Sequence, residues 1–234
     1  MPHLLLFGAT GAIGEAIAAT AISREWKVTG VSRKPPAAPM PGVKYLALDP
    51  LGPDFVPALL EGESPYTAVC WAQGTNANDS VYDVDLNHHV AIYQANVVYI
   101  LITLKALLDA QFLVPSSKLC VISSIWQNLA KQSKLSYCVS KAALQGLVLS
   151  ASVDLARDGH LINAILPGAL DTPMTRQNLA PEQIDRLSRA TAFNRLPALA
   201  DVANLACFLC SPDNAGITGQ FIAADLGFSH TRLI

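Results

Sequence analysis

Short apolar runs alternate along the chain with longer stretches that have helical periodicity. The runs are apolar throughout, a pattern typical of parallel strands that are covered on both faces of a sheet. The seven segments predicted as strands are His3–Phe7, Lys27–Val31, Val43–Leu48, Thr67–Ala72, Lys118–Ser123, Leu161–Leu166 and Gln220–Ala224. Because strand and helix alternate over the whole length, the sequence predicts an α/β fold with a doubly wound parallel sheet of seven strands.

One connection departs from this alternation. The stretch between Val31 and Val43 contains prolines at positions 35, 36, 39 and 41. Proline lacks a backbone N–H and clashes with the preceding helical turn, so we expect a loop rather than a helix to cross over here. No repeat, low-complexity tract or flexible linker follows, and a single domain over residues 1–234 is the simplest account.

The composition limits the classes of protein and partner. Of the 234 residues, 51% are hydrophobic and 15% are charged, which excludes a disordered chain and suffices for one large core. The 16 Lys and Arg against 18 Asp and Glu leave a net charge of −2, so neither nucleic acid nor an anionic membrane is an expected partner.

Hydropathy and the first residues bear on location. Mean hydropathy is +0.33, but the longest apolar stretch, Val97–Leu108, is interrupted by Lys105 and is too short to span a bilayer. The first residues, Met1–His3, form no basic leader before the first apolar run. We therefore expect a cytoplasmic protein with no membrane segment.

The five cysteines are an odd set scattered through apolar segments, which favours reduced core thiols over disulfides. Cys207 and Cys210 have the spacing of a redox motif, but they come late in an apolar helix, so the structural interpretation is preferred. The adjacent His88 and His89 point in different directions on a helix and cannot converge on one ion. No metal site is expected.

A glycine-rich turn follows the first predicted strand and opens a helix. Gly8, Gly11 and Gly14 permit a tight turn and a close approach of backbone to a pyrophosphate, while the helix N-terminus offers N–H groups to the anion. In a chain that alternates strands and helices, this context favours a dinucleotide-binding Rossmann fold over a tight turn without a ligand. The turn residues expected at the cofactor are Gly8, Thr10, Gly11, Ala12, Ile13 and Gly14.

The end of the second predicted strand bears on the choice of cofactor. NAD-specific sites place a carboxylate there for the ribose 2′-hydroxyl, whereas this chain has Ser32, Arg33 and Lys34. A guanidinium can hold a 2′-phosphate through a bidentate fork, so NADP(H) is preferred and NAD(H) stays possible. The alternative is that Arg33 and Lys34 are solvated loop residues. Asp49, after the third strand, is expected at the adenine edge.

A phenol and an ammonium lie one helical turn apart at Tyr137 and Lys141. A nearby cation stabilises a phenolate and is expected to lower the pKa of Tyr137 toward neutrality, where it serves as an acid-base catalyst. Ser124 ends the preceding strand and can donate a hydrogen bond to a substrate oxygen, with Ser123 as the nearby alternative.

Taken in order with Pro167–Gly168, these motifs resemble the short-chain dehydrogenase/reductase family in its compact single-domain branch. The resemblance extends over the whole chain and includes Asn96, the segment Asn163–Thr172 and the segment Ile217–Gln220. It implies an NAD(P)-dependent oxidoreductase in which Asn96 positions a relay water. The family roles of the other three residues are Tyr137 as acid-base, Ser124 polarising the substrate oxygen and Lys141 also holding the nicotinamide ribose.

The resemblance also implies contacts beyond the catalytic group. Pro167, Gly168 and Thr172 would border the nicotinamide, and residues 173–196 look like the mobile substrate loop of the family. The apolar residues Met174, Leu179, Leu187 and Phe193 would line it, although ordinary packing of an amphipathic helix explains them equally well.

Two departures from the family pattern stand out. Ala12 replaces one glycine, so the turn has the spacing of the extended branch, although the chain has no room for that branch's long C-terminal domain. Ala72, Gln73 and Gly74 stand where the family has Asn-Ala-Gly. All three are expected at the cofactor, because Gly74 keeps the close backbone approach.

The sequence therefore predicts an NADP(H)-dependent carbonyl reductase or alcohol dehydrogenase acting on a small molecule. The alternative is a non-enzymatic dinucleotide sensor on the same fold. Helices around residues 90–108 and 140–155 are apolar on more than one face, which favours a homo-oligomer, and the family implies a tetramer or a dimer built on these helices.

Overall fold

The computed structural model, which describes residues 1–63, 65–172, 175–176 and 180–230, contains one sheet of seven parallel strands. Their order across the sheet is β3-β2-β1-β4-β5-β6-β7, so the chain winds outward twice from β1. The strands are β1 His3–Phe7, β2 Lys27–Ser32, β3 Val43–Ala47, β4 Tyr66–Trp71, β5 Leu113–Ile122, β6 Leu161–Pro167 and β7 Phe221–Ala224. The predicted doubly wound parallel fold in a single domain is confirmed.

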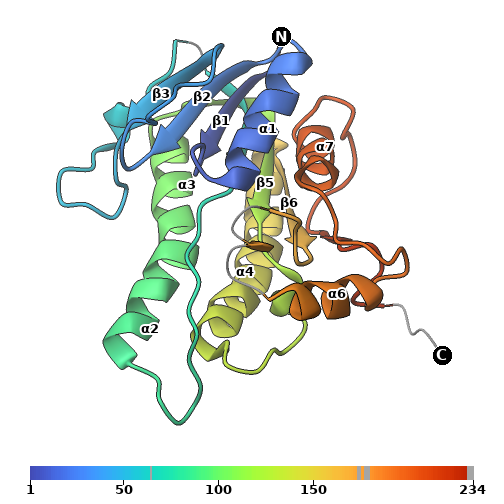
Figure 1. Ribbon diagram of the computed structural model, residues 1–234. Coiled ribbons are helices and arrows are strands. Elements are labelled where there is room, and N and C mark those ends of the chain that lie inside the picture. The colour runs from blue at the N-terminus through green and yellow to red at the C-terminus, as the bar shows by residue number, and fades with distance from the viewer. Residues whose placement is uncertain (64, 173–174, 177–179, 231–234) are drawn as a thin grey trace.

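Helices cover both faces of the sheet (Figure 1). Helices α1 (Ala12–Ser23) and α7 (Leu199–Leu209) lie on one face, and α3 (Tyr99–Asp109) and α4 (Leu135–Asp154) on the other. Successive residues of β1 belong to different layers: Leu4 and Leu6 are in the core under α1 and α7, whereas Leu5 and Phe7 are in the core under α3 and α4. A central strand buried on both faces has to be apolar throughout, which explains the runs in the sequence.

Shorter elements complete the chain. Helices α2 (Leu86–Tyr93) and α6 (Pro181–Arg189) lie beyond the carboxyl ends of the strands (Figure 1). Four further short helical segments are η1 Pro57–Leu60, η2 Gln94–Val98, η3 Ile125–Gln127 and η4 Leu155–Asp158. Residues 33–42 contain no helix, so the expected loop crossover is confirmed.

The strand β5 begins five residues before its predicted start at Lys118. Its first part pairs through a register shift between Tyr66 and Ala68 of β4, and Ser116 has a φ of 63°. Such irregular pairing, with Pro115 beside it, breaks the apolar run by which strands are recognised.

Two helices are longer than the sequence indicated. The chain is helical without a break from Leu86 to Asp109 and from Leu135 to Asp158, and both segments are long and apolar enough to cross a membrane by length and composition. The sequence indicated only the apolar stretch Val97–Leu108, so the length of the first of these helices was underestimated. The finding is weak evidence for a span, because core helices of soluble proteins pass the same test, and both helices here pack on the sheet.

The expectation of reduced cysteines is confirmed, since all five are free. Cys70, Cys120, Cys207 and Cys210 are buried in the layer under α1 and α7, and burial raises the pKa of Cys207 to about 12. These thiols are protonated packing groups at neutral pH. Among the described residues, no group of three His, Cys, Asp or Glu side chains could hold a metal ion.

Candidate active site

The glycine turn after β1 assigns its three glycines different tasks. Gly8 has a φ of +75°, and a Cβ there would lie 2.5 Å from the backbone nitrogen of Gln73. A Cβ on Gly14 would lie 2.2 Å from the carbonyl oxygen of Gly8, so this buried glycine lets α1 pack on the turn. Gly11 is the N-cap of α1, and a Cβ there would meet only the Gly8 oxygen at 3.5 Å. The fold therefore requires Gly8 and Gly14, whereas the open side of Gly11 is available to a ligand.

A cavity of about 570 Å³ opens beside this turn, over the carboxyl ends of β1, β2 and β4. Its volume is within the range of sites that bury a small molecule or cofactor. The cavity is lined by Gly8, Thr10, Gly11, Val31, Ser32, Arg33, Asp49, Leu51, Ala72, Gln73, Gly74, Thr75, His88, Ala91, Ile92, Gln94, Ala95 and Tyr99. It thus gathers most of the predicted cofactor residues of the first half of the chain.

The sequence missed the wall that the helix Leu86–Asp109 contributes. His88, Ile92 and Tyr99 line the cavity without belonging to any motif. The one signal available was the position of this helix after β4, because helices that follow central strands cross the carboxyl edge of the sheet.

Arg33 and Asp49 both line the cavity beside the turn. Both act electrostatically on the Tyr99 hydroxyl, whose pKa is raised first by burial, then by Asp49, and lowered by Arg33. Arg33 is exposed and makes no ion pair with any described residue. The Ser32 hydroxyl, in contrast, donates to the carbonyl of Lys34 at 2.6 Å and so shapes the loop. Arg33 is therefore an unpaired cation that lines the cavity, whereas Lys34 beside it does not line it.

Gln73 tests whether a polar ligand fits the cavity. Both polar atoms of its side-chain amide are buried and have no hydrogen-bond partner. A buried carboxamide left without partners costs about 1–3 kcal/mol, so native proteins rarely leave one unless a ligand or water completes it. This amide, the open side of Gly11 and the unpaired Arg33 together fit a dinucleotide, which carries hydroxyls and phosphates along its length.

Ser124, Tyr137 and Lys141 come together at the end of β5. The Ser124 hydroxyl accepts from the backbone N–H of Trp126 at 3.3 Å and lies close enough to Tyr137 to lower the pKa of its phenol. The Lys141 ammonium lies 5.7 Å from the centre of the Tyr137 ring and donates to the carbonyl oxygen of Ile122 at 3.0 Å. Helix α4 supplies the phenol and the cation from one face, as the four-residue spacing predicted.

Burial sets the protonation of this group. It raises the pKa of Tyr137, while the hydrogen bond from Ser124 lowers it by less. Burial lowers the pKa of Lys141 to about 8. The expected lowering of the Tyr137 pKa is therefore wrong for the protein without ligands, because burial raises this pKa and Lys141 is not among the groups that shift it. At neutral pH the phenol holds its proton and can act as an acid.

Ser123 does not compete for this position. Its hydroxyl donates to the side-chain oxygen of Gln127 at 2.8 Å. Ser124 is the serine that faces the phenol, which decides between the two serines on geometry.

Asn96 lies in the π-helical turn η2 between α2 and α3. Its side-chain oxygen accepts from the Thr75 N–H at 2.8 Å, and its amide nitrogen donates to the Thr75 carbonyl at 3.0 Å and to the Ser140 hydroxyl at 2.8 Å. A Cβ on Gly74 would lie 3.1 Å from the Asn96 oxygen and 3.7 Å from the Lys141 nitrogen. Asn96 thus fastens the segment after β4 to α4, beside the ammonium.

The family model described as enoyl-(acyl carrier protein) reductase matches residues 67–229, more than half of the chain. The chain belongs to the short-chain dehydrogenase/reductase family. Among its relatives, 7alpha-hydroxysteroid dehydrogenase of Clostridium sardiniense is 28% identical over 158 residues, 67% of this chain and 60% of that protein. The uncharacterized oxidoreductase YmfI of Bacillus subtilis is 24% identical over 236 residues, 96% of this chain and 97% of that protein. The chain spans less than two thirds of the hydroxysteroid dehydrogenase and nearly all of YmfI.

Solved structures agree on the fold. A short chain dehydrogenase family protein from Francisella tularensis has a TM-score of 0.89 at 20% identity, over 99% of this chain and 100% of that one. ElxO with NADP bound has a TM-score of 0.85 at 21% identity, over 97% of this chain and 98% of that one.

The other residues predicted to contact the cofactor do not line the cavity beside the turn; they are Ala12, Ile13, Gly14, Pro167, Gly168 and Thr172. Ala12, Ile13 and Gly14 belong to the first turn of α1, whose N–H groups point toward the ligand side by helix geometry. Pro167 ends β6, and the Gly168 N–H donates to the Ala224 carbonyl at 3.1 Å. The Thr172 hydroxyl accepts from the Thr175 N–H at 3.1 Å.

The predicted substrate loop is described in part. Met174 and Leu179 lie outside the described residues. Leu187 is half-buried on α6, and Phe193 is 64% exposed. Both residues lie within the predicted loop, and their exposure does not decide between substrate contact and ordinary helix packing.

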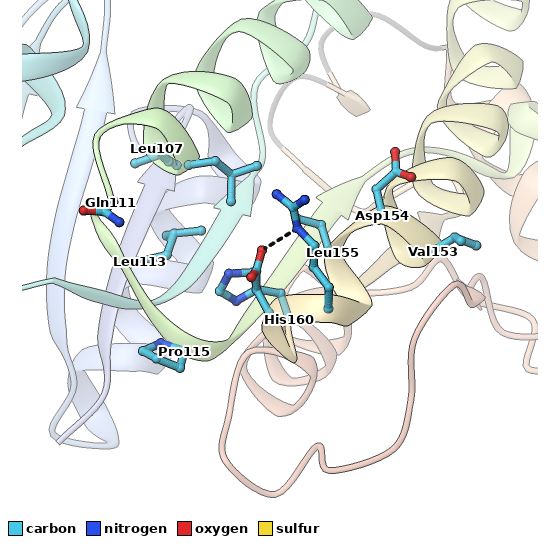
Figure 2. A pocket seen from close by; sticks show the side chains of 11 residues that line it. Leu107, Gln111, Leu113, Pro115, Val153, Asp154, Leu155 and His160 are labelled. Atoms are coloured by element: carbon cyan, nitrogen blue, oxygen red, sulfur yellow. Dashed lines mark hydrogen bonds and ion pairs between the residues drawn. The ribbon is translucent and has the colours of Figure 1, made fainter.

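A larger cavity of about 900 Å³ lies away from this site (Figure 2). It is formed by the end of α3, the start of β5 and the end of α4, near the amino ends of β5 and β6. The ion pair of Arg157 and Asp158 in its lining has an Nε–Oδ2 distance of 3.3 Å and is exposed. None of the predicted catalytic or cofactor residues lines it, so size alone does not identify the active site of this family member.

Proposed function

We propose that the protein is an NADP(H)-dependent oxidoreductase that interconverts a carbonyl group and a secondary alcohol on a small molecule. The observation that carries this proposal is the placement of Ser124 and Lys141 beside the Tyr137 phenol, with Lys141 next to Gly74 of the cofactor cavity. A binding protein without catalysis has no use for a buried ammonium next to a buried phenol, because burying the charge lowers stability.

The dinucleotide would supply the hydride donor or acceptor at its nicotinamide ring. In the direction of reduction, Ser124 donates a hydrogen bond to the substrate oxygen and orients it, and the protonated Tyr137 phenol gives its proton to that oxygen. The phenolate that remains is stabilised by the Lys141 ammonium, which is held at a fixed place by Ile122. In the direction of oxidation the same proton returns to Tyr137.

Asn96 supports the proton path in this proposal. With its side chain fixed by Thr75 and Ser140, the π-helical turn around it stays in place beside Lys141. A water held at this turn would carry protons between the ammonium and solvent. π-Helical turns of this kind are frequent at functional sites.

Arg33 is proposed to select NADP(H). Arg33 lines the cavity and forms no ion pair with any described residue. Its two neighbours in the sequence, Ser32 and Lys34, are not acidic. ElxO, which has the same fold, is named with NADP bound. The proposed 2′-phosphate contact is a charge-assisted pair, which is stronger than a neutral hydrogen bond.

Arg33→Asp is expected to lower the preference for NADPH over NADH by about 10- to 100-fold, since a hydrogen bond to a charged group contributes about 1.5–3 kcal/mol. Dissociation constants of both cofactors, measured by fluorescence titration, give the ratio. Arg157→Asp is the matched control. It also replaces an arginine by an aspartate, but near the amino ends of β5 and β6 and away from the cavity beside the turn, so it leaves the ratio unchanged. An unchanged ratio in Arg33→Asp would show that this arginine is a bystander.

We also propose a homo-oligomer, a dimer or a tetramer, in the cytoplasm. Large apolar side chains are exposed along the helix Leu86–Asp109 and along α4, among them Val90, Leu101, Leu149 and Val153. A face of this kind is stabilised by a second copy of the same face. The expected result in light scattering at micromolar concentration is a mass at least twice that of the chain, and a monomer would contradict it. Five free thiols fit a reducing compartment.

A further inference from the structure

The catalytic helix α4 begins without a cap of its own. Its N-cap residue is Lys134, which makes no side-chain capping hydrogen bond. The first N–H groups of a helix have no partner within the helix and need one from elsewhere. Tyr137 lies in this first turn, so the way in which these groups are satisfied bears directly on the proposed acid.

The missing cap comes from Asp79, in the segment that leaves the cofactor cavity after Gly74. The carbonyl oxygen of Asp79 accepts from the Leu135 N–H at 3.1 Å, and its carboxylate accepts from the Ser136 N–H at 3.0 Å. The second carboxylate oxygen accepts from the Ser136 hydroxyl. One distant residue thus satisfies the two leading N–H groups of α4 and places a negative charge at the positive end of the helix.

The charge is stable in this position. Asp79 is 7% exposed. Burial acts to raise the pKa of its carboxyl, but the two hydrogen bonds from Ser136 outweigh burial and hold that pKa below its usual value. A buried carboxylate with all these partners is a fixed anion rather than a solvated side chain.

Further bonds tie the cap to the rest of the site. The His89 Nδ1 lies 2.8 Å from the Ser136 hydroxyl, and since that hydroxyl donates to Asp79, the ring nitrogen is the donor to it. The segment between cavity and helix is held at its other end by Asn96, through Thr75. The residues from Thr75 to Asp79 therefore form a short strap between the cofactor cavity and α4.

We propose that Asp79 is a positioning residue that holds the phenol of Tyr137 against Ser124 by capping the first turn of α4. The role rests on the proposed function of Tyr137. Lys141 lies one turn further along and has its own anchor at Ile122, so loss of the cap displaces the phenol and leaves the ammonium in place.

The test compares Asp79→Ala with a matched control on the same segment. Asp83 also accepts from the N–H and hydroxyl of a serine, Ser80, but it is exposed and these two hydrogen bonds do not reach α4. Asp79→Ala is expected to lower kcat by about 10- to 100-fold, the range that a misplaced catalytic group produces, with the dissociation constant of NADPH unchanged. Amide hydrogen exchange at Leu135, Ser136 and Tyr137 becomes faster. Asp83→Ala changes neither kcat nor these exchange rates.

Two outcomes would overturn the proposal. One is an unchanged kcat of Asp79→Ala, measured well below the temperature at which this variant unfolds. That result would mean that the cap stabilises the fold but does not position the phenol. The other is unchanged exchange in the first turn of α4, a result that needs no turnover. Ser136→Ala removes only the hydroxyl bonds and serves where Asp79→Ala does not fold, with a smaller loss of kcat expected. Failure of the proposed function is seen separately, as wild-type protein without NADPH-dependent turnover.

Discussion

Tyr137→Phe is expected to lower kcat by about 10²- to 10⁴-fold, the contribution of a positioned general acid or base, while the protein still binds NADPH. The substitution removes one oxygen and keeps the ring beside Lys141. Without the hydroxyl, the substrate oxygen has no proton donor. Steady-state rates and fluorescence titration of NADPH separate the two effects.

Tyr82→Phe is the matched control for that loss. Tyr82 is 97% exposed and lies outside the cavity, so removing its hydroxyl leaves kcat unchanged. If Tyr137→Phe kept a near-normal rate with every carbonyl compound that the wild type reduces, the assignment of the proton to Tyr137 would be wrong.

Lys141→Met is expected to lower kcat without lowering the free energy of unfolding. Burial holds the Lys141 pKa at about 8 instead of 10.5, which corresponds to about 3 kcal/mol of destabilisation at neutral pH. Methionine has a similar length without the charge, and it loses the hydrogen bond that the ammonium donates to Ile122, a cost of about 1.5–3 kcal/mol for a charged donor. The ligand-free variant should therefore be as stable as the wild type or more stable by up to about 1.5 kcal/mol, while kcat falls by about 100-fold or more.

The pH dependence isolates the cause. The unfolded chain keeps the Lys141 proton up to about pH 10.5 and the folded protein only up to about pH 8, so the penalty is complete below pH 8 and disappears as the pH rises to 10.5. Denaturant unfolding of wild type and variant should give a difference that shrinks over this interval. A variant less stable than the wild type at pH 7 would contradict the account, because it would mean that the buried ammonium stabilises the fold.

Much of the fold was predictable because it follows from local patterns. Continuous apolar runs predicted the central strands, since Leu4 to Phe7 are buried on both sides of the sheet. The prolines between Val31 and Val43 predicted the loop crossover, because four prolines in this short stretch leave no room for a helix interior, where proline is not tolerated. The early start of β5 was not predictable, since its pairing depends on an irregular register with β4.

The sequence predicted which residues make up the candidate site, but it did not predict their pKa values or their hydrogen-bond partners. Spacing alone brings Tyr137 and Lys141 to one face of α4, but it carries no information on desolvation, which reverses the expected direction of the Tyr137 pKa. The cap that Asp79 provides joins positions 57 residues apart, so no window of the sequence displays it. The choice of Ser124 over Ser123 likewise needed the position of Gln127.

The central claim is that this chain moves a hydride between a nicotinamide and a carbonyl carbon, with Tyr137 providing the proton. The most direct measurement is mass spectrometry of products formed from C4-deuterated NADPH, over ketones, acyl thioesters and sugars, with wild type and Tyr137→Phe. The account predicts an alcohol with deuterium on the former carbonyl carbon from the wild type, and at most a trace from the variant. Tight binding of NADPH without deuterium transfer to any compound would contradict it and would identify a dinucleotide sensor instead.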